Sequence, residues 1–526
     1  MIGDRIAALP PSRRALLELL LVEEVASRPA AMAPRPSTGR TAPVSFGQQR
    51  LWLQDRMEPG SAAYNTANAL RLRGPVDPAL LRRCFAEIAA RHEVLRTTFA
   101  ASGGVPVQVI GPPEPVELPV TDLSGLAEAS RTAELRRILD EEVRRPFSLT
   151  LGPLHRLRLI RLAPAEHALL IVLHHIVSDA WSMGVLTREL AAIHAAFAAG
   201  RPSPLPPLPL QYADFAVWQQ RFLAGPELTG QLQWWRERLA GAPERLEVPP
   251  DRPRPAVRRF RGGMRTARLD RELAGAVREF CRARGVTLFM GLLAVFEALL
   301  QARTGETDLV VGVDVAARNP PETEDLIGFF VNQLVLRVDA GGDPGFGELL
   351  ERVRDTAVGA FAHQDVPFSR LVEELAPKRT LARNPLFQVM FGLYNIPETE
   401  LAIGGGLFGG GVAVAPLDIE GGAAVFDLSL YVAETGEELL LMLRYDADLY
   451  ETGTADRLLA DFAFLTRRVV AAPEESLSTL ATELAAERGR RREEGRGDLE
   501  KARLKTLKTV RRRAVDAPPP PPMEES

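Results

Sequence analysis

Strand-like patterns of apolar residues recur along the chain. Residues 156–162, with the sequence RLRLIRL, place apolar side chains at every second position, which predicts a half-buried strand. Residues 168–173, ALLIVL, form a continuous apolar run, which favours a central strand buried on both faces. Two later apolar segments, residues 308–315 and 329–338, also predict strands.

Helical patterns alternate with these strands. Asp77 and Pro78 suit the N-cap and the first position of a helix, and apolar residues then recur every three or four positions. A second helix is predicted from Thr287 onward, where TLFMGLLAVFEALLQA is apolar on nearly every side and is therefore expected to be buried. This alternation predicts a mixed α/β protein with two lobes of similar size.

Size and composition narrow the class of protein. The chain has 526 residues, which is too long for one ordinary core. Hydrophobic residues make up 46%, and the formal net charge of -4 does not favour nucleic acid or an anionic membrane as a partner. No run reaches the ~18 apolar residues of a membrane span. The two cysteines, Cys84 and Cys281, form no ligand cluster, so we expect a reduced, cytoplasmic setting.

Proline-rich breaks and a charged end divide the chain. Residues 25–43 predict a linker, and the residues before them predict a short amphipathic helix, not a signal peptide. Residues 201–210 and 248–255 are further breaks. After residue 484, charge runs and a row of prolines predict a tail that is at most partly helical. The predicted regions are an N-terminal helix with linker (1–43), a first lobe (44–220), a second lobe (221–484) and a charged, Pro-rich tail (485–526).

The apolar run at 168–173 ends in the sequence HHIVSDA, residues 174–180. Neighbouring strand residues point to opposite faces, so one of His174 and His175 can reach a cleft while the other packs inside the lobe. Two buried structural histidines are the simpler alternative. A zinc site lacks ligands at a suitable spacing, and a Ser-His-Asp triad lacks a G-x-S-x-G nucleophile turn. The residues alone leave a cleft-facing histidine and a purely structural pair open.

This segment resembles the His-His-x-x-x-Asp-Gly motif of the chloramphenicol acetyltransferase-like superfamily, and more closely that of the condensation domains of nonribosomal peptide synthetases. Ala180 stands in place of the usual glycine, and if that position required a positive φ, alanine would cost about 1 kcal/mol. Further motifs of these domains follow in the same order between residues 44 and 480. They are SFGQQRLWLQ (45–54), RHEVLRTTF (91–99), YADFAVWQ (212–219), IGFFVNQLVLR (327–337), HQDVPFSRLVEEL (363–375) and RNPLFQVMF (383–391).

The resemblance implies two acetyltransferase-like lobes arranged as a V with a central tunnel. Donor and acceptor enter from opposite faces, each on the phosphopantetheine arm of a carrier protein, and His175 faces the junction. The acceptor amine, with a pKa near ~8, attacks the donor thioester and must lose a proton. A neutral imidazole can accept that proton or hold the amine by a hydrogen bond, and such a base contributes ~10²–10⁴ in rate.

The resemblance also implies supporting residues. His174 packs inside the lobe. Asp179 is structural and pairs with an arginine of the second motif, for which we expect Arg96, because a buried aspartate needs such a partner. Asn332 lies on a strand of the second lobe that faces the tunnel and has a supporting polar role. No metal and no permanently bound cofactor are implied.

The motif histidines are intact, whereas cyclisation domains carry aspartates there, so a condensing domain is favoured and a starter domain stays open. The chain shows no adenylation signature and no carrier motif. We therefore expect a free-standing enzyme, or one piece of a split assembly line, that works in trans with carrier proteins and adenylation-containing subunits. One alternative is an acyltransferase of the same superfamily that uses a soluble alcohol or amine. Another is an inactive platform domain that recruits tailoring enzymes, against which the intact motif argues.

Overall fold

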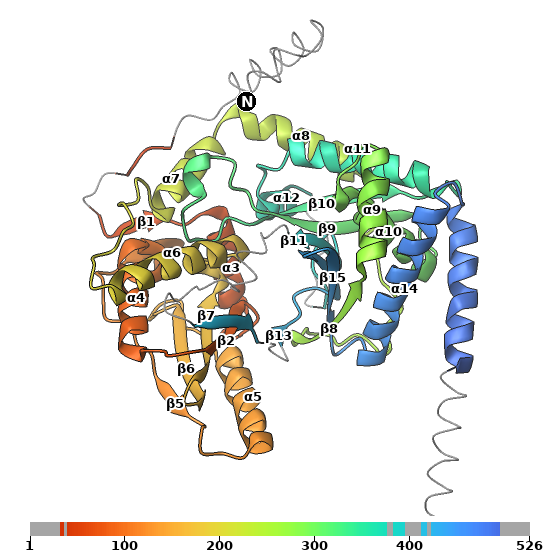
Figure 1. The fold of residues 1–526 in the computed structure, drawn as a ribbon. Coiled ribbons are helices and arrows are strands. Elements are labelled where there is room, and N and C mark those ends of the chain that lie inside the picture. The colour runs from red at the N-terminus through yellow and green to blue at the C-terminus, as the bar shows by residue number, and fades with distance from the viewer. Residues whose placement is uncertain (1–31, 36–38, 376–381, 395–411, 418–421, 495–526) are drawn as a thin grey trace, which may run out of the picture.

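The computed structural model describes residues 32–35, 39–375, 382–394, 412–417 and 422–494. Two lobes, each a β-sheet with helices, lie side by side (Figure 1). This arrangement confirms the predicted α/β class with two lobes. The amphipathic helix predicted near the N-terminus lies outside the described residues, as does most of the predicted tail.

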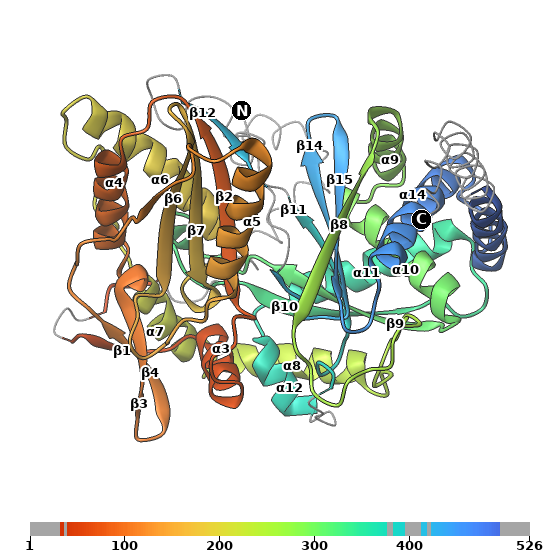
Figure 2. The ribbon, with the colours of Figure 1, turned by 90° about the horizontal axis from the view of Figure 1, so that it is seen from below.

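The first lobe is built on a five-stranded sheet. Its elements are β2 (Asn65–Arg73), α4 (Pro78–Arg91), β5 (Val120–Asp122), α5 (Glu128–Arg144), β6 (His155–Ala163), β7 (Glu166–His174), α6 (Ala180–Ala198) and β12 (Ala413–Pro416). The strand order is β12-β2-β7-β6-β5. Strand β7 is central, as predicted, and pairs antiparallel with β2 and β6. Helices α4 and α6 pack together on one side of the sheet, and α5 lies on the other (Figure 2).

The second lobe is built on a seven-stranded sheet with the order β10-β9-β11-β14-β15-β8-β13. Its elements are β8 (Arg261–Leu269), α9 (Arg271–Ala283), α10 (Leu288–Thr304), β9 (Asp308–Val315), β10 (Asn332–Asp339), α11 (Phe346–Ala362), β11 (Val389–Tyr394), β13 (Gly422–Ala423), β14 (Leu428–Thr435), β15 (Glu438–Asp446) and α14 (Thr452–Ala471). Helices α9, α10, α11 and α14 cover the face that points away from the first lobe, so the other face of this sheet is turned toward that lobe (Figure 2).

Smaller elements complete the two lobes. They are β1 (Thr41–Pro43), α3 (Phe46–Met57), η1 (Glu93–Arg96), β3 (Thr97–Ser102), β4 (Val105–Ile110), η2 (His175–Val177), α7 (Tyr212–Phe222), α8 (Pro226–Leu239), η3 (Pro321–Thr323) and α12 (Phe368–Leu375). Strands β1, β4 and β3 form a small sheet of their own.

Two segments from the second half of the chain pack into the first lobe. Strand β12 pairs antiparallel with β2 at the edge of the five-stranded sheet. Residues 326–330 contribute four apolar side chains to the hydrophobic core of the first lobe. The fit there is tight, since a Cβ on Gly328 would lie 1.9 Å from Cδ2 of Tyr212. The first lobe therefore includes two segments that lie beyond the predicted division at residue 220, namely residues 326–330 and β12.

Local signals fixed the starts of the predicted helices. Asp77 caps α4 by accepting a hydrogen bond from the amide of Ala79 at 2.8 Å, and Pro78 is the first helical residue. Thr287 caps α10 through the amide of Met290 at 3.2 Å. The strand predicted from residue 329 begins instead at Asn332, because the residues before it belong to the core of the first lobe.

Helix α10 is buried on every side, as its sequence predicted. Every residue from 290 to 300 is buried. Within the described residues, no single helix is long and apolar enough to cross a membrane. The bent pair α9 and α10, which turns by 106°, meets the requirement by length and composition only.

Glu297 of α10 is a fully buried carboxyl without a hydrogen-bond partner among the described residues. This burial raises the pKa of its carboxyl well above the usual value. The folded state then keeps a proton that the unfolded chain releases above about pH 4.3, so stability is lost as the pH rises from there. Glu297→Met is therefore expected to raise the free energy of unfolding at pH 7 by about 1–3 kcal/mol. Urea unfolding at pH 5 and pH 8 tests this, since a gain that does not grow with pH would contradict it.

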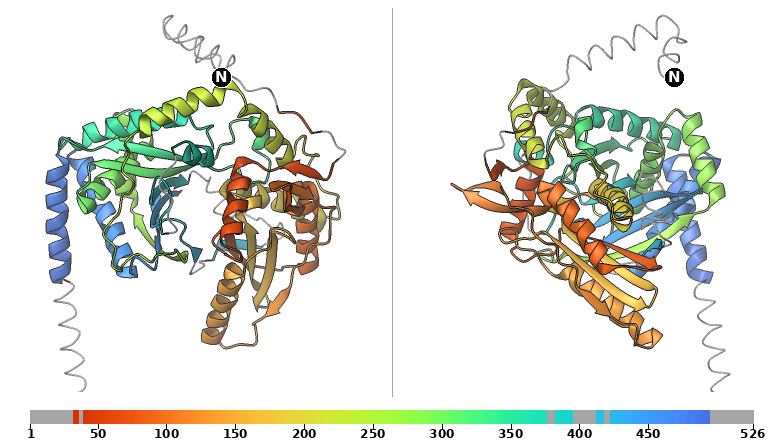
Figure 3. Two further views of the ribbon diagram at one scale, coloured as in Figure 1. Left: turned by 180° about the vertical axis from the view of Figure 1, so that it is seen from behind. Right: turned by 60° about the vertical axis from the view of Figure 1, so that its left-hand side comes forward.

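The beginning of the predicted tail belongs to the folded second lobe. Residues 477–494 are helical and lie beside α14 (Figure 3). Arg488 and Arg491 of this helix donate to the carboxylate of Asp461 in α14 at 2.8 and 3.2 Å. Asp461 is fully buried, and Arg303, a further cationic partner, is 3.8 Å away. We predicted a tail from residue 485, whereas residues 485–494 are helical and ion-paired.

Truncation after Leu484 is therefore expected to destabilise the protein. It removes Arg488 and Arg491, and among the described residues it leaves the buried carboxylate of Asp461 with only the distant Arg303, which should cost about 3–5 kcal/mol of unfolding free energy. Truncation after Glu494 keeps both arginines and serves as the control, with an expected change below about 0.5 kcal/mol. Urea unfolding compares the two proteins, and equal stabilities would show that Asp461 does not depend on this helix.

Part of the predicted N-terminal linker is fastened to the first lobe. The backbone amide and Nη1 of Arg35 both donate to Oδ1 of Asp214 at 3.0 Å. Nη2 of Arg35 donates to Glu93 at 2.5 Å. Asp214 lies on α7 and Glu93 on η1, so this short stretch is held where the first lobe meets the junction.

Candidate active site

The motif histidines lie where the central strand of the first lobe ends. His174 is the last residue of β7, and His175 begins the short turn η2. His174 is 4% exposed, whereas His175 is half-buried. One histidine thus packs inside the lobe and the other is accessible, although a turn and not strand alternation separates the two side chains.

The imidazole of His175 is held in one tautomer. Its Nδ1 lies 2.6 Å from the carbonyl oxygen of Ser178, and a carbonyl only accepts, so Nδ1 carries the proton. The ring packs edge-on against Phe329, with 4.8 Å between ring centroids. Nε2 therefore keeps its lone pair. Burial lowers the pKa of His175, against the opposing effects of the Ser178 carbonyl and Asp179, so the ring stays neutral at neutral pH.

His174 supports the turn from inside the lobe. Its ring centroid lies 6.5 Å from that of Tyr64 and 6.2 Å from that of Phe147. Its Nδ1 accepts a hydrogen bond from the amide of Ile176 at 3.1 Å. Burial lowers the pKa of His174 to about 3, so this ring stays a neutral acceptor and is not poised to exchange protons with a substrate.

Asp179 caps α6 and joins the two lobes. Its carboxylate accepts hydrogen bonds from the amides of Ser182 at 2.8 Å and Phe330 at 3.0 Å. Arg318, which follows β9 in the second lobe, donates from Nη2 to both carboxylate oxygens at 3.1 and 3.3 Å. The side chains of Asp179 and Arg318 are 0% and 3% exposed. This buried pair fixes the motif loop against residues 326–330, which pass from the second lobe into the core of the first and are called the crossing segment below.

Arg96 is not the partner of Asp179, so that prediction was wrong. Nη1 of Arg96 donates to the carbonyl oxygen of Gly111, and Nη2 lies 3.7 Å from Glu93. Both partners belong to the first lobe, whereas Asp179 faces residues that return from the second lobe. Arg318 carries only a weak sequence signal, a lone arginine just after an apolar strand. Its role depends on a contact between residues 139 positions apart.

Ala180 is accommodated without strain. It is the first residue of α6 and does not adopt a positive φ. Alanine at the glycine position of the motif therefore carries no backbone strain in this chain.

Asn332 ties a loop to the start of β10. Its Nδ2 donates to the carbonyl oxygens of Gln364 at 2.9 Å and Val366 at 2.7 Å. Its Oδ1 accepts from the amide of Phe368 at 3.0 Å. Both donor hydrogens of the side-chain amide are used by this loop, so the geometry of Asn332 suits positioning of the loop.

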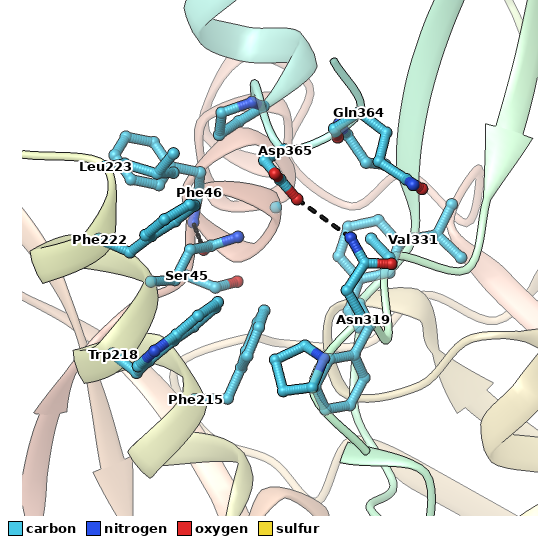
Figure 4. Close-up of a pocket in the computed structure, with 18 of the residues that line it drawn as sticks. Ser45, Phe46, Phe215, Trp218, Phe222, Leu223, Asn319, Val331, Gln364 and Asp365 are labelled. Carbon is cyan, nitrogen blue, oxygen red and sulfur yellow. Dashed lines mark hydrogen bonds between the residues drawn. The ribbon is translucent and has the colours of Figure 1, made fainter. Parts of the chain in front are cut away.

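A cavity of about 460 Å³ lies where the lobes meet (Figure 4). Its aromatic lining comes from α3, α7, α12 and the crossing segment: Phe46, Phe215, Trp218, Phe222, Phe329, Phe330 and Phe368. Asn319 and Asp365 form a polar side, hydrogen-bonded at 3.1 Å. His175 does not line this cavity, but the ring of Phe329 both lines it and contacts the imidazole. Phe329 is therefore the group shared by the cavity and the histidine.

The chemistry available at this site is that of a neutral imidazole. Nε2 of His175 can accept a proton or a hydrogen bond, and its ring is fixed by Ser178 and Phe329. Among the described residues no group of three or more His, Cys, Asp or Glu side chains could hold a metal ion.

Comparison with known proteins gives a consistent family. The model of the condensation domain family matches residues 39–489. A component of linear gramicidin synthase from Brevibacillus parabrevis is 42% identical over 464 residues, which is 88% of this chain and 9% of that protein. Phosphinothricin tripeptide synthetase PhsC of Streptomyces viridochromogenes is 42% identical over 487 residues, which is 90% of this chain and 44% of that protein. The chain spans less than half the length of these relatives.

Solved structures share the fold. The X-domain from teicoplanin biosynthesis is 31% identical with a TM-score of 0.75, covering 85% of this chain and 99% of that chain. The first condensation domain of the calcium-dependent antibiotic synthetase is 22% identical with a TM-score of 0.70, covering 84% and 98%. These likenesses confirm the predicted fold of two acetyltransferase-like lobes.

Proposed function

Since this chain belongs to the condensation domain family, whose members are acyltransferases that form amide bonds in nonribosomal peptide synthesis, we propose that it joins two carrier-bound substrates. The acceptor is an aminoacyl group with a free amine, and the donor is an acyl or aminoacyl thioester. The observation that carries this proposal is the fixed, neutral imidazole of His175 at the junction of two lobes, with Nε2 available.

The reaction is an acyl transfer from sulfur to nitrogen. The acceptor nitrogen attacks the thioester carbonyl carbon, the new C–N bond forms, and the C–S bond breaks. His175 Nε2 takes the proton that the nitrogen loses and returns it to the departing thiolate, so charge and atoms balance. The hydrogen bond from Nδ1 to Ser178 stabilises the imidazolium that forms between the two steps.

Holding the imidazole and the two substrates in reacting geometry supplies the remaining rate acceleration. Asp179 and Arg318 hold the end of the histidine turn against the second lobe, which keeps the imidazole in place relative to substrates bound between the lobes. Two tethered reactants held in reacting geometry gain an effective concentration far above that in solution. Phosphopantetheine arms of carrier proteins would supply this tethering, with no cofactor bound permanently to the chain.

The partners that this proposal requires are carrier proteins and adenylation-containing synthetases. The relatives that match are synthetases longer than the matched region, and 34% of the four-domain nonribosomal peptide synthetase AB3403 has a similar fold, at a TM-score of 0.75 and 22% identity. We further propose that these partners lie on separate polypeptides and that the reaction takes place in the cytoplasm.

An assay with matched acceptors tests the proposal. The same amino acid is offered as a carrier-bound thioester and as the free amino acid, with one carrier-bound acyl donor, and amide product is measured by mass spectrometry. We expect product from the carrier-bound acceptor at least ~10-fold more efficiently than from the free one. Efficient use of free alcohols or amines would instead identify an acyltransferase with soluble acceptors.

A platform role is the second candidate, because the similar X-domain is also known in a complex with OxyB, at 30% identity and a TM-score of 0.74. The intact His174, His175 and Asp179 favour catalysis over this role. Amide formation that depends on His175 would exclude a purely recruiting function. A chain that forms no amide with any carrier-bound pair but binds a tailoring enzyme would establish it.

A further inference from the structure

A polar patch lies on the face of the second-lobe sheet that is turned toward the first lobe. Val313 of β9 packs in the helix-covered core, and strand alternation places its neighbour Asp314 on the opposite face. Gln333 of β10 is directly paired with Asp314 in the sheet, and its Nε2 donates to Oδ1 of Asp314 at 3.2 Å. This pair therefore faces the space between the lobes.

Two tyrosines continue the patch on the next strands. Tyr394 of β11 and Tyr431 of β14 stack with 5.1 Å between ring centroids and an interplanar angle of 19°. Burial, together with the nearby charge of Asp314, raises the pKa of both phenols, so both stay neutral at physiological pH. Asp314, Gln333, Tyr394 and Tyr431 are called the sheet patch below.

Asp314 is accessible and yet enclosed. Its side chain is exposed to solvent, but burial raises the pKa of its carboxyl to about 6. Its place on the sheet face that is turned toward the first lobe accounts for both properties, because neighbouring side chains reduce its hydration without covering it. Among the described residues Oδ2 has no hydrogen-bond donor, so one oxygen of the carboxylate is free to meet a ligand.

Arg50 links the sheet patch to the surroundings of His175. Arg50 of α3 donates to Gln333, and its guanidinium lies 6.0 Å from the centroid of the Phe329 ring, which also contacts His175. Arg50 affects the pKa of both His175 and Asp314. Arg50 donates its hydrogen bond to the side-chain amide oxygen of Gln333, however, and it forms no ion pair with Asp314. Within the part of the chain that the structure describes, the aspartate is thus left without a bonded cation.

We propose that the sheet patch recognises a cationic side chain, an ammonium or a guanidinium, on one of the two aminoacyl substrates. This inference rests on the proposed condensation function and names a substrate class for it. A free carboxylate oxygen pairs with the cation, and the stacked tyrosine faces favour a positive charge over a neutral chain of the same length. The cation also offsets the cost that partial loss of hydration imposes on the ionised form of Asp314.

Paired substrates of equal length test this proposal. Carrier-bound lysine and carrier-bound norleucine are offered first as acceptors and then as donors, and kcat/KM is measured for wild type and for Asp314→Asn. Asparagine retains an acceptor oxygen for Gln333 and removes only the charge. In one of the two positions wild type should prefer lysine over norleucine, and Asp314→Asn should lower that preference by ~10-fold or more. The norleucine rate of the same variant is the reference for this ratio, so a general loss of activity does not count as a loss of preference.

A matched control separates this effect from a general loss of acidic charge. Asp308 lies at the far end of the same strand, where it pairs with Arg337 at 2.8 Å, so Asp308→Asn should leave the lysine preference unchanged. Equal use of lysine and norleucine by wild type in both positions would overturn the proposal, as would an unchanged preference in Asp314→Asn. Absence of amide product from every pair would overturn the proposed function instead. Circular dichroism of each variant verifies its fold.

Discussion

Replacing His175 by alanine should reduce amide formation by ~10²–10⁴-fold while the protein remains folded. The variant loses the Nε2 acceptor that the acceptor nitrogen needs when it becomes positively charged on attack. His175 makes one side-chain hydrogen bond, to the Ser178 carbonyl, among the described residues, so little stability depends on it. Single-turnover measurements with saturating carrier-bound substrates report this step directly. Near-normal turnover in the variant would remove His175 from the mechanism.

His174→Ala is the matched control at the neighbouring position. The folded fraction of this variant should lose less turnover than His175→Ala does. Its melting temperature should fall, because His174 is buried and supports the turn through the Ile176 amide. The pH dependence of its contribution has a definite sign. The pKa of His174 is about 3 in the folded protein, so stability is present above the unfolded value near ~6.5 and is lost as the pH falls below it.

The two histidines therefore give different pH signatures. The pKa of His175 is lowered by burial, so the base stays deprotonated at neutral pH and a loss of rate from its protonation should appear only on the acid side. A rate that depends on an unperturbed histidine, falling by half near pH ~6.5, would contradict this assignment. Comparison of the pH–rate profile with the pH–stability profile of His174→Ala separates the two effects.

Removing either Asp179 or Arg318 should cost about 3–5 kcal/mol of unfolding free energy, since each change leaves a buried charge unpaired. Asp179→Ala also removes the cap of α6 and the acceptor for the Phe330 amide. The double variant should be less damaged than the sum of the singles, with a coupling of about 1–3 kcal/mol. Urea unfolding of the four proteins completes the cycle. Strictly additive costs would show that the two residues are not energetic partners.

Arg96 supplies the control for this cycle. It does not contact Asp179, and it lies with Glu93 and Gly111 in the first lobe. Arg96→Ala combined with Asp179→Ala should therefore be additive within about 0.5 kcal/mol. A coupling as large as that with Arg318 would restore Arg96 as the partner of the aspartate.

Several features could be predicted because their signals are local. The cap at Asp77, the buried helix after Thr287 and the central strand that ends at the histidines each depend on neighbours within a few residues. The resemblance of the motif to a known family added the fold and the role proposed for His175. The start of the tail was missed, because two of the charges in residues 485–494, Arg488 and Arg491, pair with the buried carboxylate of Asp461.

The sequence by itself predicted many of the helices and strands, because they follow from the spacing of apolar residues and from capping residues. It also revealed the histidine motif, because that motif is one short, contiguous stretch. Packing in three dimensions was needed to pair Arg318 with Asp179, to direct Nδ1 of His175 to Ser178, and to turn Asp314 toward the other lobe. The Arg318–Asp179 pair joins residues 139 positions apart, so the contact between the lobes sets it and not position along the chain. The pKa values of His175 and Asp314 follow from their burial in the folded protein, which no single segment encodes.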